Sequence, residues 1–272
     1  MVHIKLNHLR QNLAGRLIGH RIYYLQQTGS TNDDAFRLGS QGEPEGTVVI
    51  AGTQTAGKGR MSRAWHSPPQ ANIYTSIILR PGFDVRRAPQ ISIAAGVAVA
   101  ETLEQYCPDK VQLKWPNDVL IAGRKICGIL SQVKMSADAI DFIVAGIGVN
   151  VNMDKEQFPA DIHETATSLS IEASRRIPRT DLIIRLYENM SKWYRELLAE
   201  GFGAVRDKWL SLSPMIGLPV AVRFHDETIT GTAAGLGDDG SLAVVTGDNK
   251  TTMVSAGDAT ILKKVEDYAS GH

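Results

Sequence analysis

A glycine-rich segment at residues 52–65 brings three basic side chains close together. Its centre holds two glycines and three cations within seven residues, namely Gly57, Lys58, Gly59, Arg60 and Arg63. The glycines allow the backbone to turn tightly and to approach a ligand without a Cβ in the way. Such a loop suits the binding of phosphate or carboxylate groups. From composition alone, a flexible basic loop in solvent remains the alternative.

Part of this segment has the spacing of a Walker A phosphate-binding loop. Gly52 and the Gly57-Lys58 pair match that motif, but Gly59 stands where a Ser or Thr would hold magnesium. The following stretch, 61–70, contains two prolines, so the helix N-terminus that a P-loop needs is not expected. A P-loop kinase is therefore the weakest candidate function.

A second polar cluster, Lys114-Trp-Pro-Asn117-Asp118, follows a predicted strand. Pro116 cannot donate to a β-ladder and is expected to end that strand. A lysine at a strand end beside Asn and Asp can bind phosphates, while the aspartate can act on a metal, as a base or on an amine. An ordinary turn with an ion pair is the alternative.

Two weaker segments carry further polar groups. In Gly146-x-Gly148-x-Asn150, glycines within a strand indicate a bulge or a ligand lying close to the backbone. Asn150 suits either the edge of an adenine or ribose or a buried structural amide. Ser30 and Thr31 precede a predicted helix, and a helix cap would fully explain them.

Composition excludes several classes of protein. The 272 residues carry 29 basic and 29 acidic side chains, so the net charge is about zero and provides no overall attraction to nucleic acids. The two cysteines form neither a disulfide framework nor a CxxC zinc pair, which favours a reducing, cytoplasmic setting. The N-terminus lacks the apolar core of a signal peptide. The most apolar stretch, 91–100, is too short to span a bilayer, so no membrane segment is expected.

The elements that must position these segments alternate between helices and strands. Apolar residues at helical spacing predict helices over 5–17, 32–39, 88–106, 180–200 and 203–211. Apolar and β-branched runs predict strands over 21–25, 47–51, 73–79, 111–115, 119–121, 126–133 and 142–152. The connections at 121–126 and 133–141 are too short for parallel crossovers. We therefore predict an α/β (α+β) domain with a mixed, largely antiparallel sheet and flanking helices.

The chain changes character after Ser213-Pro214. Short predicted strands follow one another, separated by Gly-containing turns, over 218–224, 227–234, 241–246, 250–254 and 259–263. This pattern predicts a small β-barrel. We place the domain boundary near 213, which gives a larger domain over 1–212 and a barrel over 213–272.

The motifs, in their order along the chain, strongly resemble the biotin protein ligase family. The resemblance runs from about residue 21 to 263 and rests on Ser30-Thr31-Asn32, Gln54-xx-Gly57-Lys58-Gly59-Arg60, Lys114-Trp-Pro-Asn-Asp118, Lys125-xx-Gly128 and Gly146-x-Gly148-x-Asn150. The Lys114–Asp118 block is the most specific of these. In fold, the resemblance implies a catalytic domain like the class II aminoacyl-tRNA synthetase core, followed by an SH3-like barrel.

In activity, the resemblance implies ATP-dependent ligation of biotin. Biotin would be converted to biotinyl-5′-AMP and then transferred to a lysine of a biotin carboxyl carrier domain, with acetyl-CoA carboxylase as the type of enzyme that carries it. Biotin and ATP would be substrates, and Mg²⁺ is expected with ATP. Only 27 residues precede Thr28, too few for the winged helix of the repressor members, so we expect no DNA binding and no repressor role. Family members often dimerise through the edge of the sheet, which allows a homodimer here.

The resemblance also implies roles for individual residues. Those for biotin are Ser30, Thr31, Asn32, Gln54, Gly57, Lys58, Gly59, Arg60, Lys125, Gly128 and Gly146. Those for ATP and the adenylate are Lys58, Arg60, Arg63, Trp65, Lys114, Asn117 and Asn150. As catalytic groups, Lys114, Arg60 and Arg63 would stabilise the transferring phosphate. Asp118 would orient or deprotonate the incoming lysine, and no residue is implied as a ligand of a resident metal.

This chain departs from the family pattern at two positions. Lys58 stands where most members have Arg, which keeps the charge but loses the bidentate fork. Ala166 occupies the position of an adenine-stacking aromatic residue of one branch. We also predict that the loop 55–65 is mobile without ligand and orders over the intermediate. Two alternatives remain, a lipoate or octanoate ligase of the same superfamily and a non-catalytic biotin-binding regulator.

Overall fold

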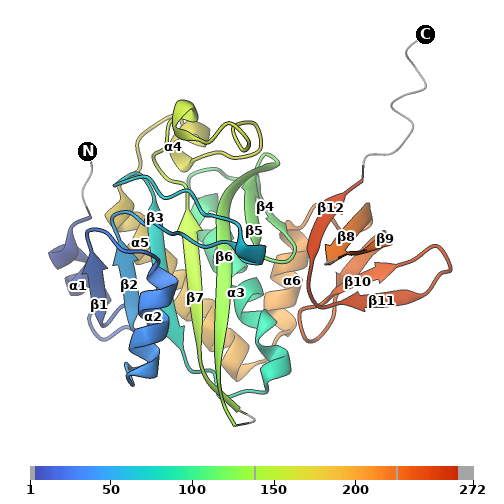
Figure 1. Ribbon diagram of the computed structural model, residues 1–272, viewed down its shortest axis with the longest axis horizontal. Helices are drawn as coiled ribbons and strands as arrows, with labels where there is room; N and C mark the ends of the chain where they lie inside the picture. The colour runs from blue at the N-terminus through green and yellow to red at the C-terminus, as the bar shows by residue number, and fades with distance from the viewer. Residues whose placement is uncertain (1–3, 138, 225, 263–272) are drawn as a thin grey trace.

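Two β-sheets of unequal size and a set of helices build the molecule. The computed structural model describes residues 4–137, 139–224 and 226–262. A seven-stranded sheet occupies the centre of the larger part, and a five-stranded sheet formed by the C-terminal residues lies beside one edge of it (Figure 1). The predicted α/β class, with a largely antiparallel sheet and flanking helices, is confirmed.

The seven-stranded sheet has the strand order β1-β2-β3-β7-β6-β5-β4. Its strands are β1 (Ile22–Leu25), β2 (Val48–Ala51), β3 (Ile73–Leu79), β4 (Val111–Lys114), β5 (Asp118–Ile121), β6 (Arg124–Ser136) and β7 (Ala139–Val149). Only β1 and β2 pair in parallel, and every other neighbouring pair is antiparallel. The short connections within β4–β7 are hairpins, as their lengths predicted.

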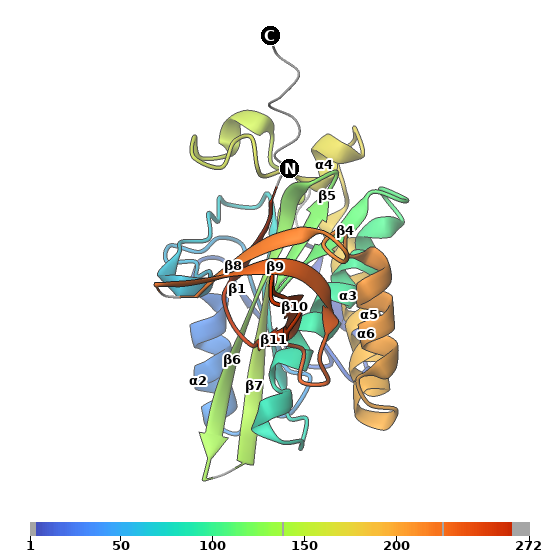
Figure 2. The same ribbon diagram turned by 90° about the vertical axis from the view of Figure 1, so that its right-hand side faces the viewer.

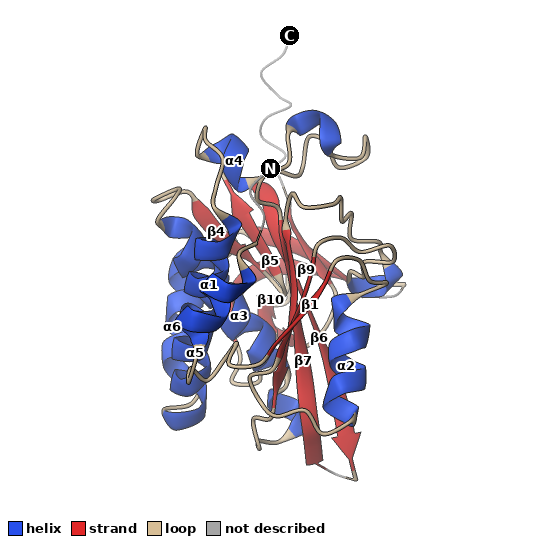
Figure 3. Cartoon of the chain, turned by 90° about the vertical axis from the view of Figure 1, so that its left-hand side faces the viewer, coloured by secondary structure: helices blue, strands red, loops and turns tan. Residues whose placement is uncertain are grey.

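Helices cover both faces of this sheet. They are α1 (Leu6–Leu13), α2 (Thr31–Ser40), α3 (Pro89–Glu104), α4 (Leu169–Glu172), α5 (Arg179–Ala199) and α6 (Gly203–Leu212). Single 3₁₀ turns lie at Arg60–Ser62, Val85–Arg87 and Lys155–Gln157. Viewed along the sheet, α1, α3, α5 and α6 lie on one side and α2 alone on the other (Figure 3).

Alternation along the strands supplies a core to each face. On β2, Val48 and Ile50 pack toward the helices α3 and α5, while Val49 between them packs against α2. On β3, Ile77 likewise packs toward α3 and α5, and Ile78 packs toward α2. Because neighbouring side chains of a strand point to opposite faces, a continuous apolar run is buried on both sides. The sheet therefore sits in the middle layer and holds its strand ends, where the site lies, in fixed positions.

The C-terminal sheet is antiparallel throughout, in the order β11-β10-β9-β8-β12. Its strands are β8 (Pro219–Phe224), β9 (Glu227–Leu236), β10 (Leu242–Val245), β11 (Thr251–Val254) and β12 (Asp258–Ile261). They curl around one another, as seen end-on in Figure 2. Their inward residues, such as Val220 and Leu242, belong to the same apolar cluster as Ile91 and Ile93 of α3. The core is therefore continuous between the two sheets.

Some predicted boundaries differ from the structure for local reasons. The helix predicted over 5–17 ends at Leu13, because Ala14 leaves the helical region and Gly15 has a φ of +70°. The strands β6 and β7 extend further toward each other than predicted, as one long hairpin that includes polar residues such as Lys134. Residue 263, the end of the last predicted strand, lies outside the described residues. The boundary near 213 stays a prediction.

Among the described residues, no helix combines the length and the apolar character needed to cross a bilayer. The longest helix, α5, is amphipathic: it buries Leu182, Leu186 and Leu197 and exposes charged residues such as Arg195. Its apolar side faces α3 and the sheet, so this helix is a component of the core.

Candidate active site

One cavity of about 590 Å³ gathers side chains from segments far apart in the sequence. The segments that line it are the start of α2, the loop between β2 and β3, strands β3, β6 and β7, the β4–β5 turn, the segment before α4, and strands β8 and β12 of the barrel. Of the residues predicted for the site, all but Gly57 line this cavity. Gly57 lies just behind the cavity wall, where its carbonyl accepts a hydrogen bond from the backbone N–H of Trp65 at 2.8 Å.

The start of α2 forms a polar, uncharged floor. Gln54 Oε1 accepts from the backbone N–H of Thr31 at 2.9 Å and lies 3.1 Å from its hydroxyl. Ser76 Oγ, on β3, lies 2.6 Å from Asn32 Oδ1, and the Asn32 amide donates to the Leu130 carbonyl at 3.0 Å. These contacts fix the direction of every polar group, so the floor suits a neutral ligand that needs directed hydrogen bonds.

Ser30 resolves an alternative that the sequence left open. It is the N-cap residue of α2 by backbone conformation, yet its side chain makes no capping hydrogen bond. Instead it lines the cavity and is 3% exposed. A buried hydroxyl at this place suits a ligand contact better than a helix cap.

Glycine on β7 makes room for the floor. A Cβ added to Gly146 would lie 1.9 Å from Asn32 Oδ1, far inside any real contact. At Gly148 a Cβ would meet the Trp65 ring at 2.6 Å. The strand can therefore run beside α2 and beside the loop only where it lacks side chains, as the glycine pattern indicated.

Trp65 forms one wall of the cavity. Its ring lies against the backbones of Gly128 and Gly148, and the Lys125 ammonium lies 5.7 Å from the ring centroid. The indole N–H is buried and has no hydrogen-bond partner among the described residues. The wall is thus apolar on its face and carries one free donor.

The β4–β5 turn places its polar groups at the strand ends. β4 ends at Lys114, just before Pro116, as predicted, and Lys114 pairs in register with Asp118 of β5. The Asp118 carboxylate lies 2.6 Å from the Lys125 ammonium. Asn117 donates to the Ile129 carbonyl at 2.6 Å, which ties the turn to β6. A lysine, a carboxylate and a second lysine therefore face the same cavity.

The basic loop is anchored at the cavity mouth. A β-bridge joins Lys58 to Ala64, and the Gly59 N–H donates to the Arg63 carbonyl at 2.7 Å. The Lys58 ammonium lies 2.7 Å from an Asp33 carboxylate oxygen in the first turn of α2.

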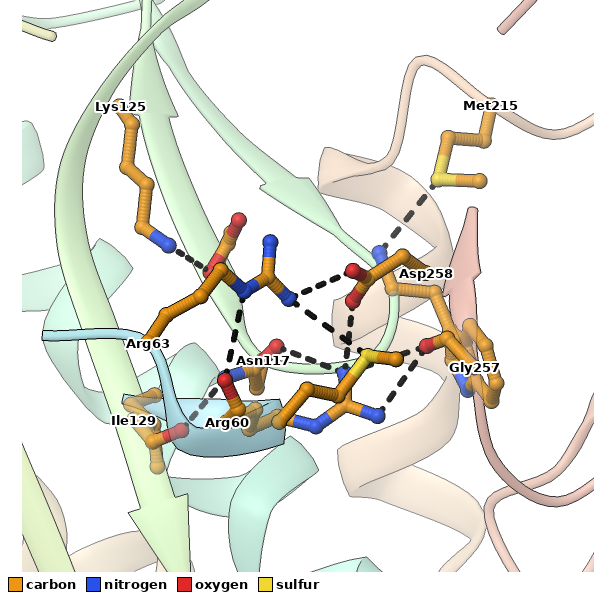
Figure 4. A network of polar contacts seen from close by, with 11 residues as sticks. Arg60, Arg63, Asn117, Lys125, Ile129, Met215, Gly257 and Asp258 are labelled. Carbon is orange, nitrogen blue, oxygen red and sulfur yellow. Dashed lines mark hydrogen bonds and ion pairs between the residues drawn. The ribbon is translucent and has the colours of Figure 1, made fainter. Parts of the chain in front are cut away.

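Two arginines of the loop meet an aspartate of the C-terminal barrel (Figure 4). Arg63 lies 2.5 Å and Arg60 3.4 Å from the two carboxylate oxygens of Asp258. Burial lowers the pKa of Arg60 and its neighbour Arg63 lowers it further, while the carboxylates of Asp258 and Asp118 raise it. Asp258 could not be predicted as a site residue from the sequence, because it belongs to no motif and is 198 residues from Arg60.

Asn150 lies in the cavity wall and is also hydrogen-bonded within the protein. It lines the cavity, and its amide also donates to the Thr167 carbonyl at 3.1 Å and accepts from Asn72 at 3.4 Å. Ala166, next to Thr167, lines the cavity too and bridges in parallel to Lys125. This corner is therefore built by the segment that leads into α4, of which the sequence analysis singled out only Ala166.

Comparison with known proteins identifies the family. Residues 24–150 match the family model described as "Biotin/lipoate A/B protein ligase family", and residues 215–261 match "Biotin protein ligase C terminal domain". The chain is 36% identical over 248 residues to a protein of Bacillus subtilis named "Bifunctional ligase/repressor BirA", covering 91% of this chain and 76% of that protein. It is 33% identical over 264 residues to the "Biotin--[acetyl-CoA-carboxylase] ligase" of Mycobacterium tuberculosis, covering 94% of each.

Solved structures agree with the sequence comparison. The biotin protein ligase of Aquifex aeolicus, solved in complex with biotin and ATP, superposes with a TM-score of 0.75 at 26% identity. The match covers 89% of this chain and 99% of that one. The resemblance that the motifs indicated is thereby confirmed. By its sequence, its fold and the residues that line its cavity, this chain belongs to the biotin protein ligase family.

Proposed function

We propose that this chain activates biotin with ATP to form biotinyl-5′-AMP and then transfers biotin to a lysine of a biotin carboxyl carrier domain. The observation that carries the proposal is the single cavity that joins a polar, uncharged floor to a cationic mouth. The floor suits the neutral ring system of biotin, and the mouth suits its carboxylate and the phosphates of ATP. Relatives named for biotin ligation, and one solved with biotin and ATP, support the same activity.

In the first step, a biotin carboxylate oxygen attacks the α-phosphorus of ATP and pyrophosphate leaves. Negative charge on the transferring phosphate has to be stabilised as the bond forms. Among the cations that line the cavity, we assign Lys114, Arg60 and Arg63 to this role, with Lys58 beside the carboxylate. Preorganised cations in a partly enclosed site lower the barrier because they need little reorientation during the reaction.

In the second step, the carrier lysine attacks the carbonyl carbon of the mixed anhydride, and AMP leaves. The attacking amine must lose a proton, since a lysine near its reference pKa of about 10.4 is mostly protonated at neutral pH. Asp118 is the carboxylate that faces the cavity from the β4–β5 turn, and we assign it to orient and deprotonate that amine. Lys125 already shows that an ammonium fits beside it.

The remaining residue assignments follow the layers of the cavity. Ser30, Thr31, Asn32 and Gln54 would bind the biotin ring, with Lys125, Gly128 and Gly146 around it. Trp65, Asn117 and Asn150 would border the nucleotide. Mg²⁺ would arrive with ATP and be held chiefly by phosphate oxygens, since the described residues hold no cluster of three or more His, Cys, Asp or Glu side chains that could bind a metal.

Among the alternatives, a lipoate or octanoate ligase is not favoured, because curated relatives such as those of Paracoccus denitrificans and Mycobacterium tuberculosis are named for biotin. A non-catalytic biotin-binding regulator would not need Lys114, Asp118, Arg60 and Arg63 in one cavity.

We further propose that the described residues do not bind DNA. The helix α1, which precedes β1, is part of the core, where it buries Leu9 and Leu13 against α5. For the location, two buried free thiols, Cys107 and Cys127, support a cytoplasmic protein.

The direct test is covalent transfer. The chain, ATP, Mg²⁺ and biotin are incubated with a purified biotin carboxyl carrier domain, and the carrier is weighed intact by mass spectrometry. We expect a mass increase of one biotinyl group on one lysine, abolished when that carrier lysine is replaced by Arg. In Asp118→Asn, pyrophosphate release should persist while transfer slows. An unmodified carrier with the wild-type chain would refute the transfer step.

A further inference from the structure

The C-terminal barrel lines the cavity with the start of β12 and with Arg223 of the neighbouring strand β8. There Asp258 lies between two side chains of the basic loop, 2.5 Å from Arg63 and 3.4 Å from Arg60. Arg60 also donates to the neighbouring Gly257 carbonyl at 3.1 Å and to Asn117 Oδ1 at 3.3 Å. Figure 4 shows the two guanidinium groups converging on this end of the barrel.

The two arginines would not take this arrangement by themselves. Both are cations on one short loop, and the side chain of Arg63 is 61% exposed, so repulsion and solvation favour its turning outward. Arg60 is more buried, with 21% of its side chain exposed, and needs an anion nearby to offset its lost hydration. One carboxylate that contacts both groups removes the repulsion and leaves one net positive charge for a phosphate.

The barrel is fixed well enough to supply such an anchor. The Trp115 indole donates to the Gly240 carbonyl at 3.1 Å, and Gln90 of α3 donates to the Asp238 carbonyl at 2.5 Å. Gly257 has a φ of +131°, a conformation that side-chain-bearing residues rarely adopt, and its carbonyl faces Arg60. The position of Asp258 is therefore set by the barrel and not by the loop that it holds.

We propose that Asp258 is a positioning residue for the adenylation step: it holds Arg60 and Arg63 side by side at the cavity mouth, ready for the phosphates of ATP. The effect of Asp258 on adenylation rests on the proposed function, whereas its anchoring of the two arginines does not. It differs from direct catalysis, because the carboxylate acts through the two arginines. It also differs from a role in which the carboxylate competes with the phosphates of ATP for the two arginines. In that case ATP would bind more tightly once the charge of Asp258 is removed.

Asp258→Asn tests the proposal, because it removes the charge and keeps the shape. We expect the KM for ATP in biotin-dependent pyrophosphate release to rise about tenfold, as one charged partner is lost from each guanidinium. The Kd for biotin, measured by calorimetry, should stay within about twofold, because Asp258 is not part of the polar floor. Asp258→Glu should recover most of the loss in KM.

A second measurement needs no activity. Trypsin cleaves after Lys58, Arg60 and Arg63, and in the ligand-free chain we expect it to cut this loop several times faster in Asp258→Asn than in the wild type. The matched control is Asp238→Asn, which breaks another ion pair between the barrel and a helix, 2.8 Å from Arg206, away from the cavity. This control should behave as the wild type in both measurements.

Each outcome decides the question. A KM for ATP that is unchanged or lower, or an unchanged rate of tryptic cleavage, would overturn the positioning role. A loss of biotin affinity equal to the change in KM would overturn it as well, since the effect would then be on the whole pocket. If the wild-type chain released no pyrophosphate with biotin, the proposed function would fail, while the cleavage rates would still test the anchor.

Discussion

At the scale of single residues, the site depends on cations whose positions are set by their neighbours. Lys114 ends β4, directly opposite Asp118, and no other basic residue enters the cavity from that strand. Its position is fixed by the sheet and not by a flexible loop, in contrast to Arg63. Rigid placement of a cation is what transition-state stabilisation requires.

We therefore expect Lys114→Ala to reduce the rate of adenylation about 10²- to 10³-fold, the usual cost of losing one preorganised group. Its free energy of unfolding should change by no more than about 0.5 kcal/mol, because the side chain is partly exposed. Pyrophosphate release and urea unfolding measure the two quantities. Lys110→Ala, at an exposed lysine outside the cavity, is the control. Retained activity would remove Lys114 from the mechanism.

Gly146 offers a test of the biotin floor. In Gly146→Ala the new methyl group would collide with Asn32 Oδ1, and either the strand or the Asn32 side chain would have to shift. Overpacking of this kind costs about 1–3 kcal/mol, so we expect the Kd for biotin to rise roughly tenfold or more. Gly203→Ala at the start of α6, where a Cβ meets nothing within 4 Å, should leave it unchanged. Equal affinities of both variants would contradict the placement of biotin beside Asn32.

At the scale of elements, the loop between β2 and β3 is the part most able to respond to ligand. Its regular structure is limited to a 3₁₀ turn over Arg60–Ser62, a bridge between Lys58 and Ala64 and a bridge from Gln54 to Thr28. Closing such a loop over a reactive anhydride would keep water away from it. Its glycines and cations alone indicated a loop suited to phosphate or carboxylate groups or, as the alternative, a flexible basic loop in solvent, and the family resemblance implied contacts with biotin and the adenylate.

We expect biotin and ATP together to slow tryptic cleavage of residues 55–65 by at least several-fold, because the loop orders over the intermediate. Biotin alone should give less protection, since the phosphates that bind the arginines are then missing. Cleavage in an exposed turn outside the site, after Lys250, serves as the internal control. Equal rates with and without ligands would show that the loop does not close.

Most elements could be predicted from local patterns. The periodicity of α5 and the apolar runs of β2 and β3 are properties of neighbouring residues, so short windows of sequence contain them. The end of α1 at Leu13 was missed because the apolar pattern continues to Leu17 while the backbone turns at Gly15. In the segment that leads into α4, the resemblance singled out Ala166, whereas Ile162 and Thr165 were missed because they belong to no motif.

At the scale of the whole molecule, the barrel and the larger part share one core and one site. Trp115, within the most specific motif of the chain, is 2% exposed and donates to the Gly240 carbonyl of the barrel. Asp258 contributes from the same barrel to the cavity mouth. Neither contact could be predicted from the sequence, because each joins residues more than a hundred positions apart and no periodic pattern encodes such a pair.

Trp115→Phe should show how strongly the two parts are coupled. The substitution leaves the Gly240 carbonyl without its donor, and we expect a loss of about 1–3 kcal/mol in the free energy of unfolding beyond the effect of ring size. Trp209→Phe is the matched control, since Trp209 is also 2% exposed and no hydrogen bond of its indole is seen among the described residues. Urea unfolding followed by circular dichroism measures both. Equal losses would show that the hydrogen bond adds nothing to the packing.

The first half-reaction tests the activity itself. Purified chain is mixed with ATP and Mg²⁺, without any carrier, and pyrophosphate release is followed with biotin, lipoate or octanoate. We predict a burst stoichiometric with the protein for biotin alone, with biotinyl-5′-AMP found bound by mass spectrometry. Release with lipoate or octanoate in place of biotin would contradict the assigned substrate, and release with none of the three acids would contradict the ligase activity.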